Sequence, residues 1–515
     1  MVKGDIVMVP VDSEQHVRCL REYRKVLQST MGPSGSCKAI VTSGGYTDIA
    51  CTCKTLTSRL ELSSPICKYI NNIAAGHIDH GLYCAVLLCH LLEHQLLSED
   101  STKRKTEQEA MEVIFQQIKK LLISEYVCKS LCFDSVTNLI PVVRTVIVSK
   151  CGTFLSGMEV DGLCMEVIRV FINCVDEETN VVNKIHLKVE SGLNAFMSCK
   201  GLLYTVTESH HIEIASKVMS NIKVLVFVVK LEYNADSFTT CTSLLDVLDL
   251  SVQLGVKVIA CQQVISPEVK VFLRRKNIIF LERMGSDFTK QLIRLTHAFP
   301  LSQLDIVGSE FENFFGHLTS VELLRFFEQD YLVLHNKNIC IATLLIQTSS
   351  LLGQENIKIL ISQAFAALRS VAAQPLLILG GGCLEIWLIG QIHHIKEVWK
   401  DVEMSRVATW LQRSLQSTCY AVEMDTLYHH GWRETEVCCG CRLLNRQTVE
   451  QQGGAWLSLQ EVVSSEVNLS NPRQPEWTLR SDTIVEPQQQ KHQVICDVFE
   501  AFANLSNIGL IVQEL

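Results

Sequence analysis

The feature that most constrains the fold is a series of strand and helix patterns that alternate at short spacing in the middle of the chain. Residues 224–229 form a continuous β-branched and aromatic run, and a helical pattern over 243–254 follows it. The strand pattern VKVIAC covers 256–261, and after another helix a further strand pattern covers 278–281. Strands that are joined through single helices run parallel to one another. We therefore expect residues from about 190 to 340 to form a compact α/β domain.

The helix between the last two of these strands has a clear start signal. Ser266, Pro267 and Glu268 supply an N-cap serine, a proline at the first helical position and an acid in the first turn. A second helix is predicted to start near Ser286 and Asp287. Both helices fit crossovers between parallel strands.

Helical patterns dominate the rest of the chain, including the N-terminal quarter. From Ser13 onward, Val17, Leu20, Tyr23 and Leu27 recur at helical spacing. Further helices are predicted over residues 80–98, 106–125, 354–374, 384–400, 403–420 and 488–506. The first of these is apolar on most of its circumference, which places it in the middle of a bundle. At roughly 150 residues per domain, the length indicates about three domains, with the α/β domain inserted into a largely helical protein.

Composition excludes several classes of protein. The formal net charge is −9 and the basic clusters are short, so the chain lacks the electrostatic footprint of a nucleic-acid-binding protein. No apolar run approaches the ~18 residues of a membrane helix, and the first residues, MVKGDIVMVPVDSEQ, lack the apolar core of a signal peptide. With 22 cysteines and no such signal, we expect reduced thiols in the cytosol rather than a disulfide framework.

Residues 90–94, HLLEH, match the H-x-x-E-H pattern of inverted zinc proteases. On a helix, His90 and His94 would share a face and Glu93 could activate a water molecule. A zinc site also needs a third ligand and a polar cavity. This helix is instead lined by Ala85, Val86, Leu87, Leu88, Leu91 and Leu92. We favour a coincidental match at a helix end and keep a zinc hydrolase as the alternative of another class.

A thiol-rich motif, Cys438-Cys439-Gly440-Cys441, could begin a metal or redox site. Structural zinc sites take four ligands, usually as two spaced pairs, and no second pair stands nearby in the sequence. The favoured interpretation is packed or exposed thiols. Other cysteines, such as Cys84, Cys89, Cys164 and Cys383, lie on apolar faces and are expected to act as small hydrophobic residues.

Two glycine-containing loops could let the backbone approach a phosphate group. Gly32-Pro33-Ser34-Gly35 follows the first helix, and Gly380-Gly381-Gly382 separates the apolar run LLIL from a later helix. Glycine permits a close approach and the N–H groups of a helix start bind anions, although a tight turn can have the same sequence. Between them, Asp79-His80-Gly81 enters the apolar helix, and Val485-Glu486-Pro487 precedes the last helix.

This order of motifs resembles the group II chaperonins, the family of the cytosolic chaperonin and the archaeal thermosome. Their pattern is GPxG, NDGAT, GDGTT, GGGxxE and DP, at similar separations over essentially the whole chain. Lys38 falls on the lysine of GPxGxxK, and Glu385 falls on the glutamate of GGGxxE. The resemblance implies an α+β multi-domain subunit. Its parts are a helical equatorial domain that binds ATP, a small intermediate domain that hinges and an α/β apical domain that holds client protein.

The resemblance also gives the expected domain boundaries. The equatorial domain would cover residues 1–127 and 380–515, the intermediate domain 128–190 and 341–379, and the apical domain 191–340. Group II chaperonins usually carry a long helical protrusion in the apical domain. Here little more than one helix separates the two strand patterns at that place, so we expect a shortened protrusion.

Family members hydrolyse ATP with acidic side chains that hold magnesium and position the attacking water. The NDGAT aspartate falls on Gly44, the GDGTT aspartate on His80 and the intermediate-domain aspartate on Gln363. These residues are poor ligands for a hard magnesium ion, which prefers carboxylate oxygens. We therefore expect no ATPase activity, no catalytic residue and no bound metal. Weak binding of ATP or its magnesium complex stays compatible with Gly32, Pro33, Gly35, Gly81, Gly381, Gly382 and Glu486, the last of which replaces the aspartate of DP.

Among divergent chaperonins, the chain is similar to the McKusick-Kaufman/Bardet-Biedl branch. The shared features are GPSG followed by GGY, D-x-G-L in place of GDGTT, CQQVISPEVKVFL with IIFLERMG, and LGGGCLE. This resemblance implies a non-enzymatic assembly chaperone in the cytoplasm, at the centrosome and at the ciliary basal body. The expected partners are other Bardet-Biedl chaperonin-like proteins, cytosolic chaperonin subunits and, as clients, subunits of the BBSome, a ciliary trafficking complex. Neither nucleic acid nor membrane insertion is expected. The alternative is an active ATP-dependent folding chaperonin that recruits other acids, such as Asp48 or Asp79.

Overall fold

The chain folds into two compact units, one of which is inserted into the sequence of the other. A computed structural model describes residues 6–10, 14–32, 35–41, 44–45, 47–97, 104–124, 128–149, 155–175, 185–206, 219–232, 238–303, 311–349, 351–399, 401–429, 479, 484–508 and 510–514. The bipartite unit consists of Met1–Ile168 and Thr348–Leu515, and the inserted unit of Arg169–Gln347. The finer division into equatorial, intermediate and apical domains stays a prediction.

A six-stranded mixed sheet forms the centre of the inserted unit. Its strand order is β10-β9-β8-β11-β12-β7. The strands β8 (Met219–Phe227), β9 (Val256–Cys261) and β10 (Ile279–Leu281) run parallel, as the alternating pattern predicts. The other half of the sheet is antiparallel and consists of β11 (Gly316–Phe326), β12 (Gln329–His335) and β7 (Leu202–Thr205).

Helices cover both faces of the parallel strands, which explains the unbroken apolar run in β8. Val224 packs in a cluster with residues of α11 (Gly285–Thr296). Its neighbour Leu225 packs in another cluster, with residues of α9 (Phe238–Gln253) and α10 (Pro267–Arg275). Successive side chains of a strand point to opposite faces, so a strand that is covered twice has no polar face.

The start of α10 differs in one detail from the prediction. Ser266 is the N-cap residue, but its side chain accepts no hydrogen bond from the helix. Pro267 occupies the first helical position and has no N–H to satisfy. The proline therefore marks this helix start more than the serine hydroxyl does.

A smaller three-stranded sheet makes the inserted unit larger than the predicted α/β domain. Its order is β5 (His186–Ser191), β13 (Ala342–Thr348) and β6 (Ala195–Lys200), with β6 antiparallel to β13. Because β5 and β13 reach beyond the range 191–340, the compact unit extends past both of those limits.

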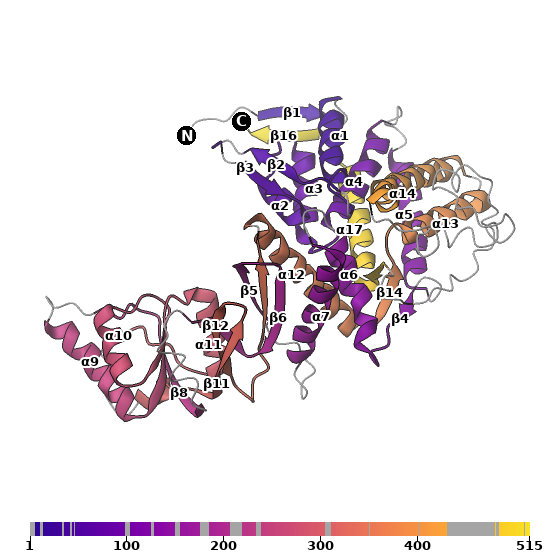
Figure 1. The fold of residues 1–515 in the computed structure, drawn as a ribbon. Coiled ribbons are helices and arrows are strands. Elements are labelled where there is room, and N and C mark those ends of the chain that lie inside the picture. Colours follow the sequence, from indigo (N-terminus) through magenta and orange to yellow (C-terminus); the bar gives the residue numbers. More distant parts are fainter. Residues whose placement is uncertain are drawn as a thin grey trace. The chain divides into compact units, whose positions relative to one another are not determined.

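A buried central helix organises the bipartite unit. Helix α4 (Gly81–Leu96) is buried along nearly its whole length, so the apolar circumference predicted for residues 80–98 is confirmed. The helices that pack against α4 include α1 (Glu14–Gln28), α3 (Pro65–Gly76), α14 (Val402–His429) and α17 (Gln488–Ser506) (Figure 1). A helix that is enclosed in this way needs no polar stripe.

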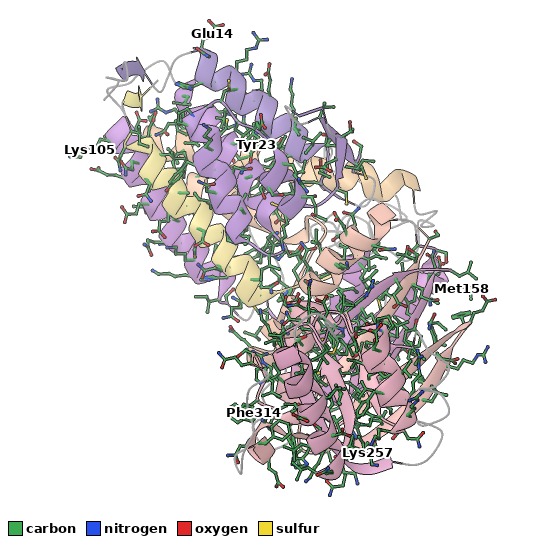
Figure 2. All side chains as sticks on the ribbon, turned by 90° about the vertical axis from the view of Figure 1, so that its left-hand side faces the viewer. Glu14, Tyr23, Lys105, Met158, Lys257 and Phe314 are labelled. Carbon is green, nitrogen blue, oxygen red and sulfur yellow. The ribbon has the colours of Figure 1, made fainter. Side chains whose placement is uncertain are left out.

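The helices predicted from apolar spacing are all present. Tyr23 of α1 lies within the bundle (Figure 2), and its hydroxyl donates to Asn71 Oδ1 at 3.0 Å. The remaining helices of this unit are α2 (Cys53–Arg59), α5 (Arg104–Leu122), α6 (Ile140–Val148), α12 (Leu351–Ala373) and α13 (Cys383–Trp399), and α7 (Gly157–Asn173) runs from this unit into the inserted one. Among the described residues, no helix is both long and apolar enough to cross a membrane.

The N-terminal quarter is not entirely helical, contrary to the prediction. The strand β1 (Ile6–Pro10) pairs antiparallel with β16 (Leu510–Glu514), so segments near both ends of the chain lie side by side (Figure 1). The strands β2 (Lys38–Val41) and β3 (Thr47–Ala50) form an antiparallel hairpin. The local sequence of these short strands does not separate them from the helical patterns around them.

A small sheet joins the segments that carry the later glycine and acidic motifs. The strand β14 (Leu376–Leu379) pairs antiparallel with β15 (Val485–Pro487) and with β4 (Lys129–Ser130). Ile378 faces Glu486 in this register. The pairing brings Glu486 next to the glycines that follow β14, although the two motifs are far apart in the sequence.

Candidate functional site

Two of the three glycines after β14 are required by the backbone geometry of the loop. Gly381 and Gly382 have φ values of +63° and +87°, in the left-handed region that favours glycine. The N–H of Gly380 donates to the Ile484 carbonyl at 3.0 Å. A Cβ atom on Gly380 would lie 2.9 Å from Glu486 Oε1. The loop thus allows the Glu486 carboxylate to approach the backbone closely.

The start of α4 forms a second wall of the site. His80 is the N-cap residue, and its Nδ1 lies 3.9 Å from Glu486 Oε2. A Cβ atom on Gly81 would lie 2.3 Å from the Ala74 carbonyl oxygen and 2.4 Å from Cys53 Sγ. Only glycine fits where α4 begins, and the helix start faces the residues around Glu486.

Gln363 joins α12 to the same region. Its side chain is buried, and its Nε2 donates to the carbonyl oxygen of Ile78, two residues before His80, at 2.6 Å. Within the described part of the chain, Gln363 Oε1 has no hydrogen-bond partner. The predicted residues His80, Gly81, Gln363 and Glu486 and the glycines after β14 are therefore brought together by these contacts.

The early glycine loop is held against the end of α1. Gly32 has a φ of +81°, and its carbonyl accepts from the Gly35 N–H at 3.1 Å. Lys38 Nζ donates to the carbonyls of Ser29 and Ser36 at 3.1 and 2.9 Å. Pro33 lies outside the described residues. These contacts fix the turn that follows α1.

Gly44 lies exposed in the turn of the β2–β3 hairpin. In the described part of the chain, no polar contact joins it to the residues around Glu486. Asp48 of the same hairpin forms an ion pair with Arg59, with 3.1 Å between Oδ2 and NH1. The sequence alone did not indicate that this hairpin carries its own ion pair.

The centre of the site is a buried lysine that the sequence interpretation missed. Lys491 Nζ of α17 lies 2.8 Å from Glu385 Oε1 of α13 and 3.2 Å from Glu486 Oε2. The same nitrogen lies 3.6 Å from the centroid of the Tyr83 ring of α4. The side chains of Lys491 and Glu385 are each only 4% exposed. We call Tyr83, Glu385, Glu486 and Lys491 the lysine cluster.

The electrostatics of the lysine cluster favour its charged forms. Burial would raise the pKa of the Glu385 carboxyl, but the Lys491 ammonium and several hydrogen bonds lower it below its usual value. Burial would likewise lower the pKa of Lys491, and the Glu385 and Glu486 carboxylates raise it instead. Burial, followed by the charge of Glu385, raises the pKa of Tyr83. Glu385 and Lys491 are thus a stable ion pair rather than a proton donor and acceptor poised near neutral pH.

A signal for the lysine cluster exists in the sequence. Lys491 lies at helical spacing from Val494, Ile495 and Val498, so it belongs to the same buried face of α17. A lysine on an apolar stripe is almost never fully buried unless it is paired. The position therefore predicts a buried carboxylate partner, although it does not tell which carboxylate.

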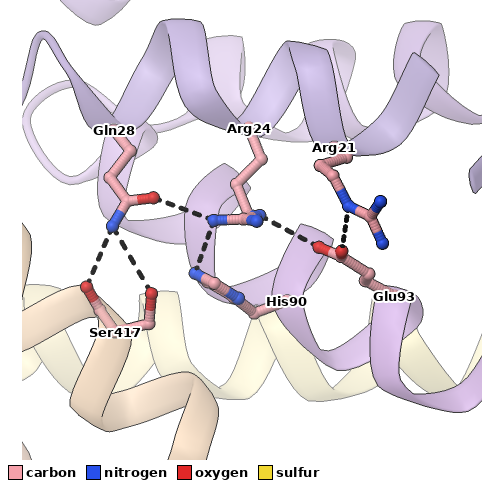
Figure 3. Close-up of polar contacts among 6 residues, drawn as sticks. All are labelled: Arg21, Arg24, Gln28, His90, Glu93 and Ser417. Atoms are coloured by element: carbon pink, nitrogen blue, oxygen red, sulfur yellow. Dashed lines mark hydrogen bonds and ion pairs between the residues drawn. The ribbon is translucent and has the colours of Figure 1, made fainter. Parts of the chain in front are cut away.

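The HLLEH motif takes part in a structural network in which two arginines form ion pairs with its glutamate (Figure 3). Glu93 accepts from Arg21 Nε at 2.6 Å and from Arg24 Nε at 3.1 Å. Arg24 NH1 also lies 3.2 Å from His90 Nε2 and donates to Gln28 Oε1 at 2.9 Å. Gln28 continues the network from α1 to the Ser417 carbonyl of α14 at 3.1 Å.

The contacts of this network disfavour the binding of a metal ion by the HLLEH motif. Burial, with the charges of Arg24 and His94, lowers the pKa of His90 to about 3. A cation between His90 and His94 would face the Arg24 guanidinium, and the Glu93 carboxylate is already engaged. The described residues contain no group of three or more His, Cys, Asp or Glu side chains that could hold a metal ion. The motif thus serves to pack α1 against α4.

Three of the cysteines expected to act as small hydrophobic residues are packing groups in the structure. Cys84, Cys89 and Cys164 are buried free thiols, and burial raises the pKa of each. Buried thiols of this kind are inert packing groups. The Cys438–Cys441 motif and the side chain of Cys383 lie outside the described residues.

Comparison with known proteins places this arrangement in a family. The TCP-1/cpn60 chaperonin family matches residues 24–418. The chain is similar to the proteins named Molecular chaperone MKKS of Homo sapiens and Mus musculus, at 24% identity over 498 and 496 residues respectively. These alignments cover 85% of this chain and 86% of each relative.

A solved structure extends the likeness to the fold. The crystal structure of a group III chaperonin in the open state matches with a TM-score of 0.68 and 14% identity, covering 96% of this chain and 97% of the other. The fold is therefore that of an α+β chaperonin subunit, as the sequence predicts. Since the family match also spans well over half of the residues, the chain belongs to the TCP-1/cpn60 chaperonin family.

Proposed function

We propose that this protein is a hydrolysis-deficient chaperonin that holds client and partner proteins instead of driving them through an ATP cycle. The observation that carries the proposal is the amide of Gln363, which donates to the Ile78 carbonyl at the start of α4. A family member that hydrolyses ATP would need a carboxylate at this position. An amide offers magnesium only a neutral oxygen in place of a carboxylate, and it cannot take a proton from water.

The residues present do not fit a magnesium ion. Glu486 approaches the glycine loop and Glu385 lies in the first turn of the helix that follows it, and both carboxylates are engaged by the Lys491 ammonium. His80 stands at the N-cap of α4, and a neutral imidazole is a poor ligand for this hard cation. The backbone of Gly32, Gly35, Gly381 and Gly382 would still bind a nucleotide weakly.

The client-holding part of the proposal rests on the chaperonin framework. The inserted unit has an α/β fold, and helix α9 lies between the main-sheet strands β8 and β9 in the sequence. The family resemblance assigns client binding to this part of the chain. The shortened protrusion that the resemblance implies would suit this unit to holding a protein surface rather than to closing a folding chamber.

We further infer from the resemblance to the McKusick-Kaufman/Bardet-Biedl branch that the clients are BBSome subunits. The partners would be other Bardet-Biedl chaperonin-like proteins and cytosolic chaperonin subunits. The protein would then act in the cytoplasm, at the centrosome and at the ciliary basal body. The support is the similarity to proteins named molecular chaperones together with the motifs GPSG, GGY and LGGGCLE.

Phosphate release from ATP tests the enzymatic part of the proposal. Protein purified free of other chaperonins should release phosphate at the background rate, with and without magnesium, and Gln363→Ala should give the same rate. Magnesium-dependent turnover that Gln363→Ala abolishes would contradict the proposal. It would favour an active chaperonin that uses other acids, such as Asp79.

Gentle affinity purification from ciliated cells, followed by native mass and partner identification, tests the partner assignment. Co-purification of chaperonin subunits with BBSome subunits would support an assembly intermediate. A pure homo-oligomer of ring size would instead indicate a self-contained folding chaperonin. The two outcomes differ in the identity of the bound chains as well as in mass.

A further inference from the structure

Helix α7 is apolar on two sides, although a surface helix normally presents a polar face to solvent. Leu163 and Val167 lie on its buried side. Met158, which Figure 2 labels, is 88% exposed, and Met165 and Ile172 on the same side of the helix are 37% and 44% exposed. These three residues recur at every seventh position, the spacing by which one helix packs along another. The exposed side of α7 therefore has the pattern of a contact with a second helix.

Two charged residues flank Met165 on this side of α7. Asp161 lies about one turn before it and Arg169 about one turn after it, and both are exposed. Asp161 forms an ion pair with Arg144 of α6, while 60% of its side chain stays exposed. Gly162 leaves open space beside Asp161, because a Cβ atom there would meet nothing within 4 Å. An acid thus precedes Met165 and a base follows it along the exposed side.

We propose that α7 is the contact surface of a weak homodimer, in which the helices of two copies pack antiparallel with their Met165 side chains at the two-fold axis. Met158 and Ile172 are equally far from Met165 in the sequence, so Met158 of each copy would pack on Ile172 of the other. Asp161 and Arg169 are also equally far from Met165, so each acid would lie beside the base of the other copy. We call these five residues the α7 stripe.

The α7 stripe favours a second copy of this chain over a different protein as its occupant. A two-fold interface is formed by the same surface on both subunits, so that surface has to complement itself. The α7 stripe complements itself in charge when the two helices run antiparallel, whereas a parallel pair would set Asp161 against Asp161 and Arg169 against Arg169. Gly162 also leaves room for the long Arg169 side chain of the other copy. Methionine adapts its shape to the surface that it contacts.

The expected association is weak. One pair of 17-residue helices buries less than the ~800 Å² per partner of a standard stable complex. We therefore expect a dissociation constant on the order of 10–100 µM. Opposite charges across such an interface fix the register more than they add affinity. The inference goes beyond the proposed function and is independent of it, because it concerns neither ATP nor client proteins.

Sedimentation velocity of the full-length protein, at concentrations below and above this range, tests the dimer. The wild type should change reversibly from monomer to dimer as the concentration rises. Met165→Glu should raise the dissociation constant by at least about tenfold, because two like charges would meet at the two-fold axis. Val113→Glu is the matched control, since Val113 of α5 is also 37% exposed. This control should dimerise as the wild type does.

An exchange of charges tests the antiparallel arrangement. Arg169→Asp and Asp161→Arg should each stay monomeric alone, because like charges would face each other across the axis. An equimolar mixture of the two variants should form a heterodimer, since every acid then lies beside a base again. A variant that is misfolded would not regain association on mixing. Two variants that are folded by circular dichroism but stay monomeric in the mixture would overturn the proposed pairing.

Cross-linking locates the axis and does not depend on the charge variants. Met165→Cys, treated with a short bis-maleimide, should give a peptide that is joined to its own copy at position 165, as identified by mass spectrometry. Val113→Cys should give no self-joined peptide at position 113. A wild type that is monomeric throughout and a Met165→Cys protein without this link would overturn the proposal and leave the α7 stripe to a helix of another protein. An oligomer of any size that survives Met165→Glu would also overturn it.

Discussion

Lys491 Nζ and Glu385 Oε1 are 2.8 Å apart, in a place where both side chains are almost completely buried. The pair connects α17, near the C-terminus, to α13, which follows the glycine loop. Glu486 Oε2 also lies 3.2 Å from Lys491 Nζ, so one lysine stabilises two negative charges. The stability of the pocket should therefore depend on Lys491 more than on either acid alone.

The first prediction concerns the loss of this charge. Lys491→Met should lower the free energy of unfolding by about 3–5 kcal/mol, because two buried carboxylates lose their partner. The combined change of Lys491→Met and Glu385→Gln should be less destabilising than the sum of the two single changes. Urea unfolding followed by circular dichroism measures both. Arg18→Ala, which removes an exposed ion pair on α1, should have almost no effect. Strict additivity of the two buried changes would argue against the pairing.

The second prediction concerns the pairing of α1 with α4. Glu93→Gln should destabilise the protein by about 2 kcal/mol, since Arg24 would lose its charged partner in a partly buried place. Arg21→Ala should cost less, because the Arg21 side chain is 44% exposed against 13% for Arg24. Chemical denaturation of the variants gives this order. If Glu93 were instead part of a zinc site, the purified wild type would contain stoichiometric zinc that Glu93→Gln perturbs.

The third prediction concerns pH. The pKa of His90 is lowered to about 3 in the folded protein, from an ordinary value of 6.5. As pH falls below 6.5, the unfolded chain therefore binds a proton that the folded protein does not. Stability from this residue is complete above pH 6.5 and is lost as pH falls toward 3, by up to about 1.4 kcal/mol per pH unit.

His90→Gln provides the measurement for this residue. Glutamine can still accept a hydrogen bond from Arg24, but it does not titrate. Between pH 6.5 and pH 5, the free energy of unfolding of the wild type should fall by roughly 1.5 kcal/mol more than that of the variant. Above pH 7 the two proteins should show the same pH dependence, which serves as the internal control. Equal slopes below pH 6 would mean that His90 is not held neutral by its surroundings.

The sequence predicts well where one segment carries the whole signal. The strand over 256–261 and the helix over 488–506 occur at the predicted residues, because each has a clear period and a clear boundary. The buried nature of α4 follows from Ala85 to Leu92, which leave no polar stripe. The motif order also led to the chaperonin family, since the spacing of several glycine and acidic signals spans the chain.

The sequence could not predict features that depend on contacts between distant segments. Lys491 has its partners on α13 and β15, and no local pattern names them. The pairing of β1 with β16 joins the two ends of the chain, and each strand has only five residues. The sequence favours a coincidental match for HLLEH but cannot name the partners of Glu93, because Arg21 and Arg24 belong to another helix. Such pairs are chosen by the fold as a whole rather than by local propensity.

The last prediction concerns the glycine at the start of α4. Gly81→Ala should destabilise the protein by at least about 2 kcal/mol, because its Cβ would overlap a backbone carbonyl that cannot move away. The clash is with the Ala74 oxygen at 2.3 Å and with Cys53 Sγ at 2.4 Å. Gly162→Ala is the matched control, since a Cβ there meets nothing within 4 Å on the exposed face of α7. That change should stabilise by about 0.5–1 kcal/mol through helix propensity. Thermal and urea unfolding of both variants tests the contrast. A Gly81→Ala protein as stable as the wild type would show that the start of α4 can shift, and with it His80 and the wall that it forms beside Glu486.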